Sequence, residues 1–184
     1  MSAYLAAWVI HRTSGSTMWV SVRYSTVGIA PTHGNANLKL MASTATYEDV
    51  NLILRLYEMR REDKLRTARD WFAKSFKVKS MEEFNKLCPP TYDTNAYYRM
   101  VVSYWEMVAS FITAGVLNEE LYFQSGLEML FCWERIRDVV PEAREFFKNA
   151  NLYKNLETVS NRLIERMEKN SPGSYAAFSA RVRG

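Results

Sequence analysis

The sequence predicts an all-α fold, a single-domain bundle of about five to seven helices that follows a flexible N-terminal leader. Three observations support this class. After Met41, apolar residues recur at every third or fourth position through most of the chain, as they do on the buried face of a helix. Helix-capping residues come directly before these apolar runs, and Gly or Pro follows several of them. The 184 residues, 48% of them hydrophobic, suffice for one domain with a substantial core.

Residues 1–40 differ from the rest of the chain in charge and in pattern. They contain Arg12, Arg23 and Lys39 but no acidic residue, so they carry +3 of the net charge of +4. Thr17–Ala30 alternates in the manner of a short strand, but a single strand without a partner cannot form a sheet. We therefore interpret residues 1–40 as a poorly ordered leader or an upstream extension of the functional domain.

The remainder divides into a helical bundle domain, residues 41–170, and a short C-terminal tail, residues 171–184. The tail begins with Ser171-Pro172-Gly173, which breaks the last helix. Tyr175 and Phe178 are expected to pack back on the domain in preference to contacting RNA or a membrane.

Two helices are predicted in the first part of the bundle. The first begins at Thr46, which forms a capping-box-like pattern with Asp49, and runs to about Arg61. Asp63 can cap the second helix, which ends before Lys79. Both carry apolar residues at helical spacing, so both are expected to pack against a core.

A third, short helix opens with the capping box Ser80–Glu83 and must end at Pro89-Pro90. The longest apolar helix then begins after Asp93 or Thr94. It ends at Gly115, because a glycine is commonly found just past a helix C-terminus. Its broad apolar face predicts that this helix is largely buried.

Asn118 caps a further long helix, which runs to Val140 before Pro141. Because only Gly115–Leu117 connects it to the preceding helix, the two are expected to pair closely. Gly126 inside this helix costs about 1 kcal/mol relative to Ala. We attribute its presence to close approach of a neighbouring group.

Two helices complete the bundle. Pro141 opens a short helix through Phe147, and the last helix runs from about Asn151 to Lys169. The apolar seam of this last helix is narrow, which suits docking against one or two helices and leaves a role in dimerisation open.

The most site-like pattern lies in the helix that ends at Gly115. Its polar residues follow one another at spacings of four, three and four, so they nearly stack along the helix axis. This polar stripe consists of Arg99, Ser103, Glu106 and Ser110. The favoured interpretation is an interhelical polar network, which charged residues in a core require. A binding surface is the alternative.

The residue types argue against most metal and acid-base chemistry in the predicted domain. Both histidines, His11 and His33, precede Met41, so the usual general base and commonest metal ligand is missing. Cys88 and Cys132 lie far apart without metal-ligand spacing. Two such cysteines do not form a disulfide scaffold, so we expect reduced thiols and a cytoplasmic protein. No catalytic residue, cofactor or metal ligand is predicted, and an enzyme that uses paired carboxylates ranks behind two binding functions.

Charge and hydropathy bear on the partners. Nucleic-acid binding is disfavoured, because the chain after residue 40 has a net charge of only +1 and such binding needs a basic patch. The apolar run Ala3–Ile10 is too short to cross a bilayer, so no membrane span is predicted.

The segments Asn95–Glu106, Gly126–Glu134 and Leu54–Glu62 together resemble a family of uncharacterised bacterial proteins. The resemblance covers about residues 47–182 and excludes the leader. It implies an all-helical domain of unknown function from a bacterium, and it carries over no catalytic residue.

Two functions remain open. The leading one is a non-enzymatic interaction module, a homodimer or the binder of an unknown protein partner, which uses an apolar helix face or the surface Tyr97–Glu106. The alternative is a bundle that binds or senses a small apolar or anionic ligand, with Arg99 orienting its anionic group. Its pocket would be lined by Met100, Trp105, Met107, Met129 and Trp133. Ligand binding predicts a cavity between the two central helices, whereas a partner surface predicts an exposed apolar patch.

Overall fold

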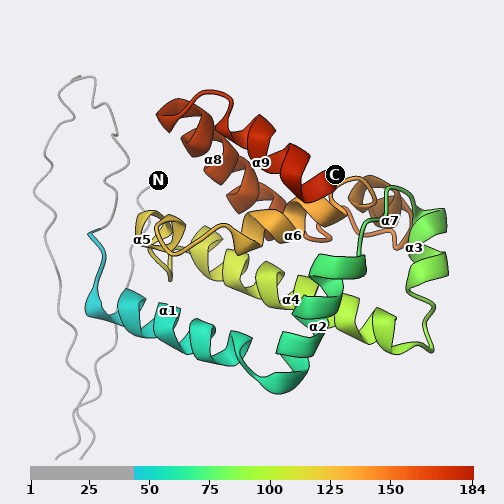
Figure 1. The fold of residues 1–184 in the computed structure, drawn as a ribbon. Coiled ribbons are helices and arrows are strands. Elements are labelled where there is room, and N and C mark those ends of the chain that lie inside the picture. Colours follow the sequence, from blue (N-terminus) through green and yellow to red (C-terminus); the bar gives the residue numbers. More distant parts are fainter. Residues whose placement is uncertain (1–43) are drawn as a thin grey trace, which may run out of the picture. The chain divides into compact units, whose positions relative to one another are not determined.

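The computed structural model describes residues 44–184, which form nine helices and no strand within that range (Figure 1). The predicted all-α class is confirmed. The leader, residues 1–40 with its alternating segment Thr17–Ala30, lies outside the described residues. In chain order the helices are α1 (Tyr47–Arg60), α2 (Asp63–Ser75), α3 (Met81–Leu87), α4 (Asp93–Thr113), α5 (Glu119–Phe123), α6 (Glu128–Ile136), α7 (Val140–Phe146), α8 (Lys154–Asn170) and α9 (Ser174–Arg183).

Helices α1 and α3 begin where local capping residues predict, whereas α2 is capped by Glu62, which accepts from the Leu65 amide, and not by Asp63 as expected. The hydroxyl of Thr46 accepts a hydrogen bond from the Asp49 amide, and the Asp49 carboxylate accepts one from the Thr46 amide, which completes a capping box. Ser80 caps α3 by accepting from the Glu83 amide. These bonds satisfy N–H groups that have no partner within their own helix.

The predicted continuous helix from Asn118 to Val140 is wrong, and this accounts for part of the larger number of helices. The chain leaves helical geometry after α5 and resumes it at α6. Gly126 lies in the break with a φ of +147°, a conformation that residues with a side chain rarely adopt. A Cβ atom there would meet nothing within 4 Å, so the backbone conformation, not close approach of a neighbour, explains the glycine.

The C-terminal segment contains helix α9, where the sequence predicted only a short tail. Its attachment depends on Glu134, whose side chain is fully buried. Glu134 Oε1 accepts from the Tyr175 hydroxyl at 2.6 Å, and Oε2 accepts from the Ser179 hydroxyl at 2.8 Å. Phe178 is buried beside them. Tyr175 and Phe178 therefore pack on the domain, as expected.

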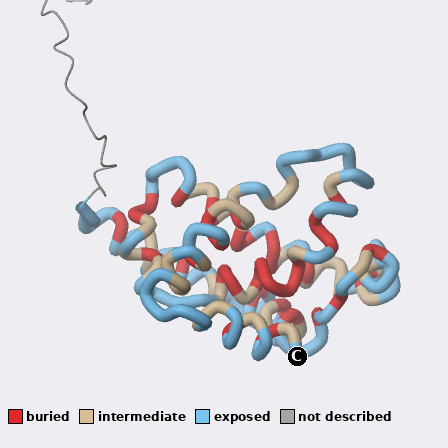
Figure 2. Tube along the Cα trace, turned by 90° about the horizontal axis from the view of Figure 1, so that it is seen from above, coloured by how far each residue is buried: buried red, intermediate tan, exposed pale blue. Residues whose placement is uncertain are grey.

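Helix α4 is the centre of the domain and packs most extensively against α2 and α8. Figure 2 shows buried positions gathered in the middle of the domain and exposed ones along its outer segments. An aromatic cluster joins α2, α3 and α4. Phe76 stacks on Phe72 with ring centroids 4.7 Å apart and on Tyr98 at 5.2 Å, and Phe84 meets Tyr98 edge-on. Such contacts fix the side of α2 that faces α4.

The end of α2 is secured by a buried arginine of α6. Arg135 donates to the backbone carbonyls of Phe76 and Ala73 at 2.9 and 3.2 Å. A cation at a helix C-terminus interacts favourably with the helix dipole and satisfies carbonyls that lack partners in the helix. Burial lowers the pKa of Arg135.

We expect Tyr175→Phe to destabilise the domain by about 2 kcal/mol, because it removes a hydrogen bond to a buried carboxylate. Urea denaturation measures the loss, and hydrogen exchange should show that the amides of α9 lose the most protection. Tyr92→Phe is the control, since Tyr92 is largely exposed. Equal stability of the two variants would contradict this role for Glu134.

Candidate functional site

The structure does not bring the predicted polar stripe together as a site. Arg99 and Ser103 are exposed, and Glu106 and Ser110 are half-buried. The hydroxyls of Ser103 and Ser110 donate to carbonyls of their own helix, three residues earlier. Within the described residues, Glu106 is the member of the stripe that reaches another helix through hydrogen bonds.

Glu106 caps the start of α8 from α4. Its Oε1 accepts from the backbone amide and side-chain amide of Asn155 at 3.2 and 2.8 Å, and Oε2 accepts from the Leu156 amide at 2.8 Å. A carboxylate at a helix N-terminus gains from both the unpaired N–H groups and the helix dipole. The interhelical network expected for the stripe is thus found at this one residue.

The residues predicted to line a pocket lie in different surroundings. Met129 and Trp133 are buried in the core, and Met107 is half-buried against it. Met100 and Tyr97 line a separate hollow of about 490 Å³ between α2 and α4. Trp105 lines a pocket of about 410 Å³ between α2, α4 and α6.

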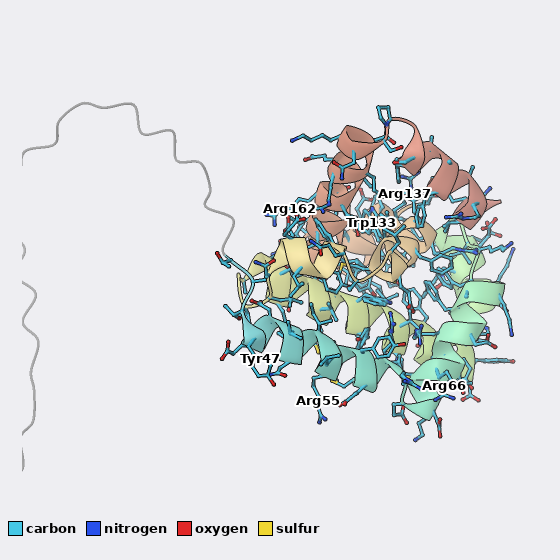
Figure 3. The ribbon with its side chains drawn as sticks, turned by 60° about the vertical axis from the view of Figure 1, so that its left-hand side comes forward. Tyr47, Arg55, Arg66, Trp133, Arg137 and Arg162 are labelled. Carbon is cyan, nitrogen blue, oxygen red and sulfur yellow. The ribbon has the colours of Figure 1, made fainter. Side chains whose placement is uncertain are left out.

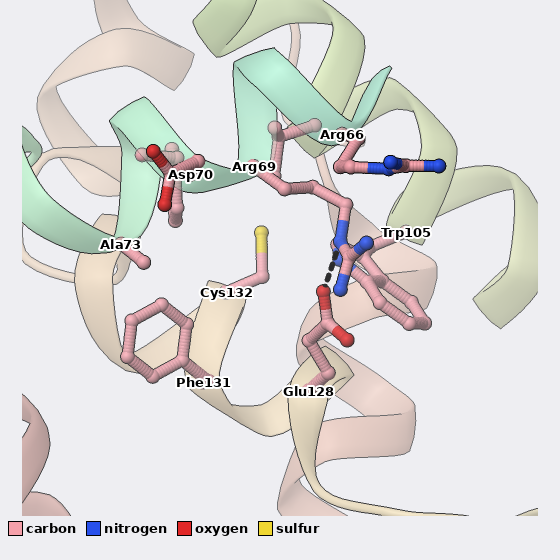
Figure 4. A pocket seen from close by; sticks show the side chains of 10 residues that line it. Arg66, Arg69, Asp70, Ala73, Trp105, Glu128, Phe131 and Cys132 are labelled. Carbon is pink, nitrogen blue, oxygen red and sulfur yellow. Dashed lines mark hydrogen bonds and ion pairs between the residues drawn. The ribbon is translucent and has the colours of Figure 1, made fainter. Parts of the chain in front are cut away.

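This pocket combines an apolar floor with a charged rim (Figure 4). In Figure 4, Arg69 of α2 and Glu128 of α6 meet beside the ring of Trp105. Glu128 also accepts from Arg60 of α1 at 2.7 Å, so one carboxylate ties three helices together. The full lining is Arg66, Arg69, Asp70, Phe72, Ala73, Val101, Trp105, Glu128, Phe131 and Cys132.

A second candidate site is a row of large apolar side chains on the outer side of α1, here called the α1 face. Spacings of three, four and three place them on one side of the helix. Figure 3 shows Tyr47, at the start of this row, beside α1. The α1 face consists of Tyr47, Val50, Leu54 and Tyr57, with exposed fractions of 74, 40, 56 and 49%.

The opposite side of α1 is fixed to the domain by a few specific contacts. Leu56 is buried, and its carbonyl accepts from the Tyr104 hydroxyl at 2.7 Å. Asp49 Oδ1 accepts from the Asn118 amide at 2.7 Å, and Arg60 pairs with Glu128. The α1 face therefore points outward by construction of the fold.

Sequence reasoning recognised α1 but missed its exposed face. Leu52, Ile53 and Leu56 turn toward the core while Val50 and Leu54 turn away from it. The exposed face could have been noticed because the apolar residues of this helix cover more of its circumference than one buried side requires.

The two thiols are held in their neutral form. Burial raises the pKa of Cys88 to about 11, and burial together with the nearby Glu128 carboxylate raises the pKa of Cys132. A protonated thiol is a poor nucleophile and a poor metal ligand. Among the described residues no cluster of three or more His, Cys, Asp or Glu side chains could hold a metal ion. In the same part of the chain, the helices lack the combination of length and apolar character that crossing a membrane requires.

The fold and these features define an all-helical domain with an exposed apolar helix face and a pocket with a charged rim. Residues 45–163 match the family described as Domain of unknown function (DUF4760), and the chain belongs to that family. The match confirms the expectation of an uncharacterised domain family. No curated protein and no solved structure matches the chain.

Replacing the carboxylate that caps α8 should be costly. We expect Glu106→Ala to destabilise the domain by about 2 kcal/mol, because several N–H groups lose a charged acceptor. Thermal or urea unfolding measures the difference. Glu165→Ala, at an exposed position of α8, is the matched control and should stay within about 0.5 kcal/mol of the parent protein.

Asp49 should make stability depend on pH in the acid range. Hydrogen bonds from the Thr46 amide, the Asn118 amide and the Thr46 hydroxyl hold the pKa of Asp49 below its usual value. A lowered pKa stabilises the fold above the unfolded-state pKa, and this contribution is lost as pH falls through the folded-state value. Asp49→Asn should therefore be less stable near neutral pH, and the difference should shrink in acid.

Urea unfolding of both proteins between about pH 7 and pH 2 measures this dependence. Glu48→Gln is the control, because Glu48 is an exposed acid in the same helical turn. A difference between the parent protein and Asp49→Asn that stays constant with pH would refute the assignment.

Proposed function

We propose that this domain is a non-enzymatic interaction module that self-associates through the α1 face. One observation carries the proposal: four large apolar side chains form an exposed row on a helix whose other side is bonded to the domain. Burying such a side chain gains about 1.5–3 kcal/mol, and the domain leaves this gain unused. Exposed rows of this kind are typical of surfaces that bind another protein.

The distribution of charge along α1 favours a second copy of the chain as the partner. Of the charged residues at the two ends of α1, Glu48 in the first turn and Arg61 just after the last turn are exposed, whereas Asp49 and Arg60 are bonded within the domain. Two α1 helices related by a two-fold axis perpendicular to them run antiparallel, so Glu48 of each copy lies at the same end of the pair as Arg61 of the other. The helix dipoles are then also opposed favourably.

The spacing of the row suits this arrangement. A two-fold axis beside Leu54 places Tyr47 opposite the second copy's Arg61, since both are seven residues from Leu54. Arg61 already lies over a tyrosine ring, with its guanidinium carbon 5.8 Å from the centre of Tyr57. An arginine on an aromatic face is a favourable contact, and the dimer would form it twice more.

The proposal also includes the setting that the sequence suggested, the bacterial cytoplasm. Cys88 and Cys132 are free thiols in the described structure, and free thiols persist in reducing compartments.

Sedimentation equilibrium of the full chain tests the proposal. The parent protein should form a dimer, and Leu54→Glu should shift it to monomer, because two carboxylates would meet at the two-fold axis in an apolar contact. Leu54 is more than half exposed, so this variant should keep the stability of the monomer within about 0.5 kcal/mol.

Met59→Glu is the matched control. Met59 is 44% exposed on the same helix but lies outside the row, so its variant should remain dimeric. A parent protein that stays monomeric at about 100 μM, or two variants with the same dimer dissociation constant, would overturn the proposal.

A further inference from the structure

We propose that the pocket between α2, α4 and α6 binds a small molecule that carries a single negative charge on an apolar body. This inference is independent of self-association, because none of the four residues of the α1 face lines the pocket. A volume of about 410 Å³ lies in the range of small-molecule sites. The floor is apolar and largely aromatic, and it consists of Phe72, Val101, Trp105, Phe131 and Cys132.

Arg69 is positioned in advance for an anion. Its Nε donates to Glu128, and its Nη1 donates to the Arg60 carbonyl at 3.2 Å. These bonds hold the guanidinium at the rim with one quarter of the side chain exposed. They leave Nη2 without a partner among the described residues. A guanidinium that is already fixed loses little entropy when it binds a carboxylate.

Arg66 supplies a second, more adjustable cation. It lies three residues before Arg69 on α2, so both side chains emerge on the same side of that helix. Arg66 is 63% exposed at its side chain, and its Nη2 both donates to the Arg61 carbonyl at 3.0 Å and lies 3.6 Å from Asp63 Oδ1. Its remaining donors can join Arg69 on one carboxylate group above the apolar floor.

The local charge balance selects a monoanion. The charged residues of the lining and their ion-pair partners comprise four cations and three carboxylates, which leaves one positive charge to be neutralised. A dianion would place its second charge close to Glu128 without a compensating cation. The four cations are Arg60, Arg66, Arg69 and Lys74, and the three carboxylates are Asp63, Asp70 and Glu128.

The apolar body of the ligand should be a flat ring system. Trp105 and Phe131 line the pocket from α4 and α6, and aromatic walls favour stacked or edge-on rings. Trp105 is only 4% exposed, and the guanidinium carbon of Arg60 lies 6.0 Å from the centre of its ring. The wall is therefore rigid on the side where the anionic group binds.

Isothermal titration calorimetry of the full chain with three matched probes tests this inference. The probes share one naphthalene body and differ in charge: 2-naphthoate, 2-naphthyl phosphate and 2-naphthalenemethanol. We expect 2-naphthoate to bind at least about tenfold more tightly than the other two, the worth of one charge-assisted hydrogen bond. Arg66→Gln should weaken 2-naphthoate about tenfold and leave the neutral alcohol unchanged. Arg55→Gln, at an exposed arginine of α1, should change neither.

A second variant tests the location without altering charge. Ala73 lines the pocket and is exposed, so Ala73→Phe should fill the space and abolish 2-naphthoate binding while the thermal midpoint stays unchanged. Three outcomes would overturn the inference: no heat from 2-naphthoate at about millimolar concentration, equal or tighter binding of the phosphate or the alcohol, and retained binding in Ala73→Phe. Equal affinity of Arg66→Gln and Arg55→Gln would likewise remove the role of the rim.

Discussion

The domain depends on carboxylates that accept hydrogen bonds from helix starts elsewhere in the chain. Short helices leave a large share of their N–H groups without an internal acceptor, and burying such groups unpaired is costly. Glu106 of α4 accepts from backbone amides at the start of α8, and Asp49 of α1 accepts from the Asn118 amide at the start of α5. Glu142 of α7 accepts from the Met81 amide at the start of α3. The same bonds that satisfy the backbone thus set the arrangement of the helices.

Two further carboxylates extend this principle to side-chain donors. Glu134 accepts hydrogen bonds from two hydroxyl groups of α9, and Glu128 forms ion pairs with one arginine of α1 and one of α2. Each stands on α6, which therefore attaches both ends of the described domain to its middle. The pocket and the α1 face both derive their geometry from Glu128, since Arg60 orients α1 and Arg69 forms the rim.

The sequence predicted those features whose causes are local. Thr46 and Ser80 cap helices within three residues, and periodicity identified the helices that they begin. An interhelical contact was predicted for the stripe that contains Glu106, but its partners in α8 could not be, because they lie about fifty positions away along the chain. Trp105 was predicted to line a pocket, and it does. The arginine predicted to bind an anionic ligand beside it was Arg99 of the same helix. The arginine that lies beside it is Arg69, from a helix whose register against α4 no periodicity reveals.

The long-range capping by Glu106 has a consequence for the history of the family. Every residue except proline supplies a backbone amide at the start of α8, so for these backbone bonds a substitution mainly changes the acceptor. Asn155 contributes a side-chain amide as well, and Glu106 and Asn155 therefore form a pair in which a change at one alters the worth of the other. Relatives that lack an acid at the position of Glu106 should carry their own capping residue at the start of α8. The two solutions would then appear as alternative, linked states in an evolutionary tree.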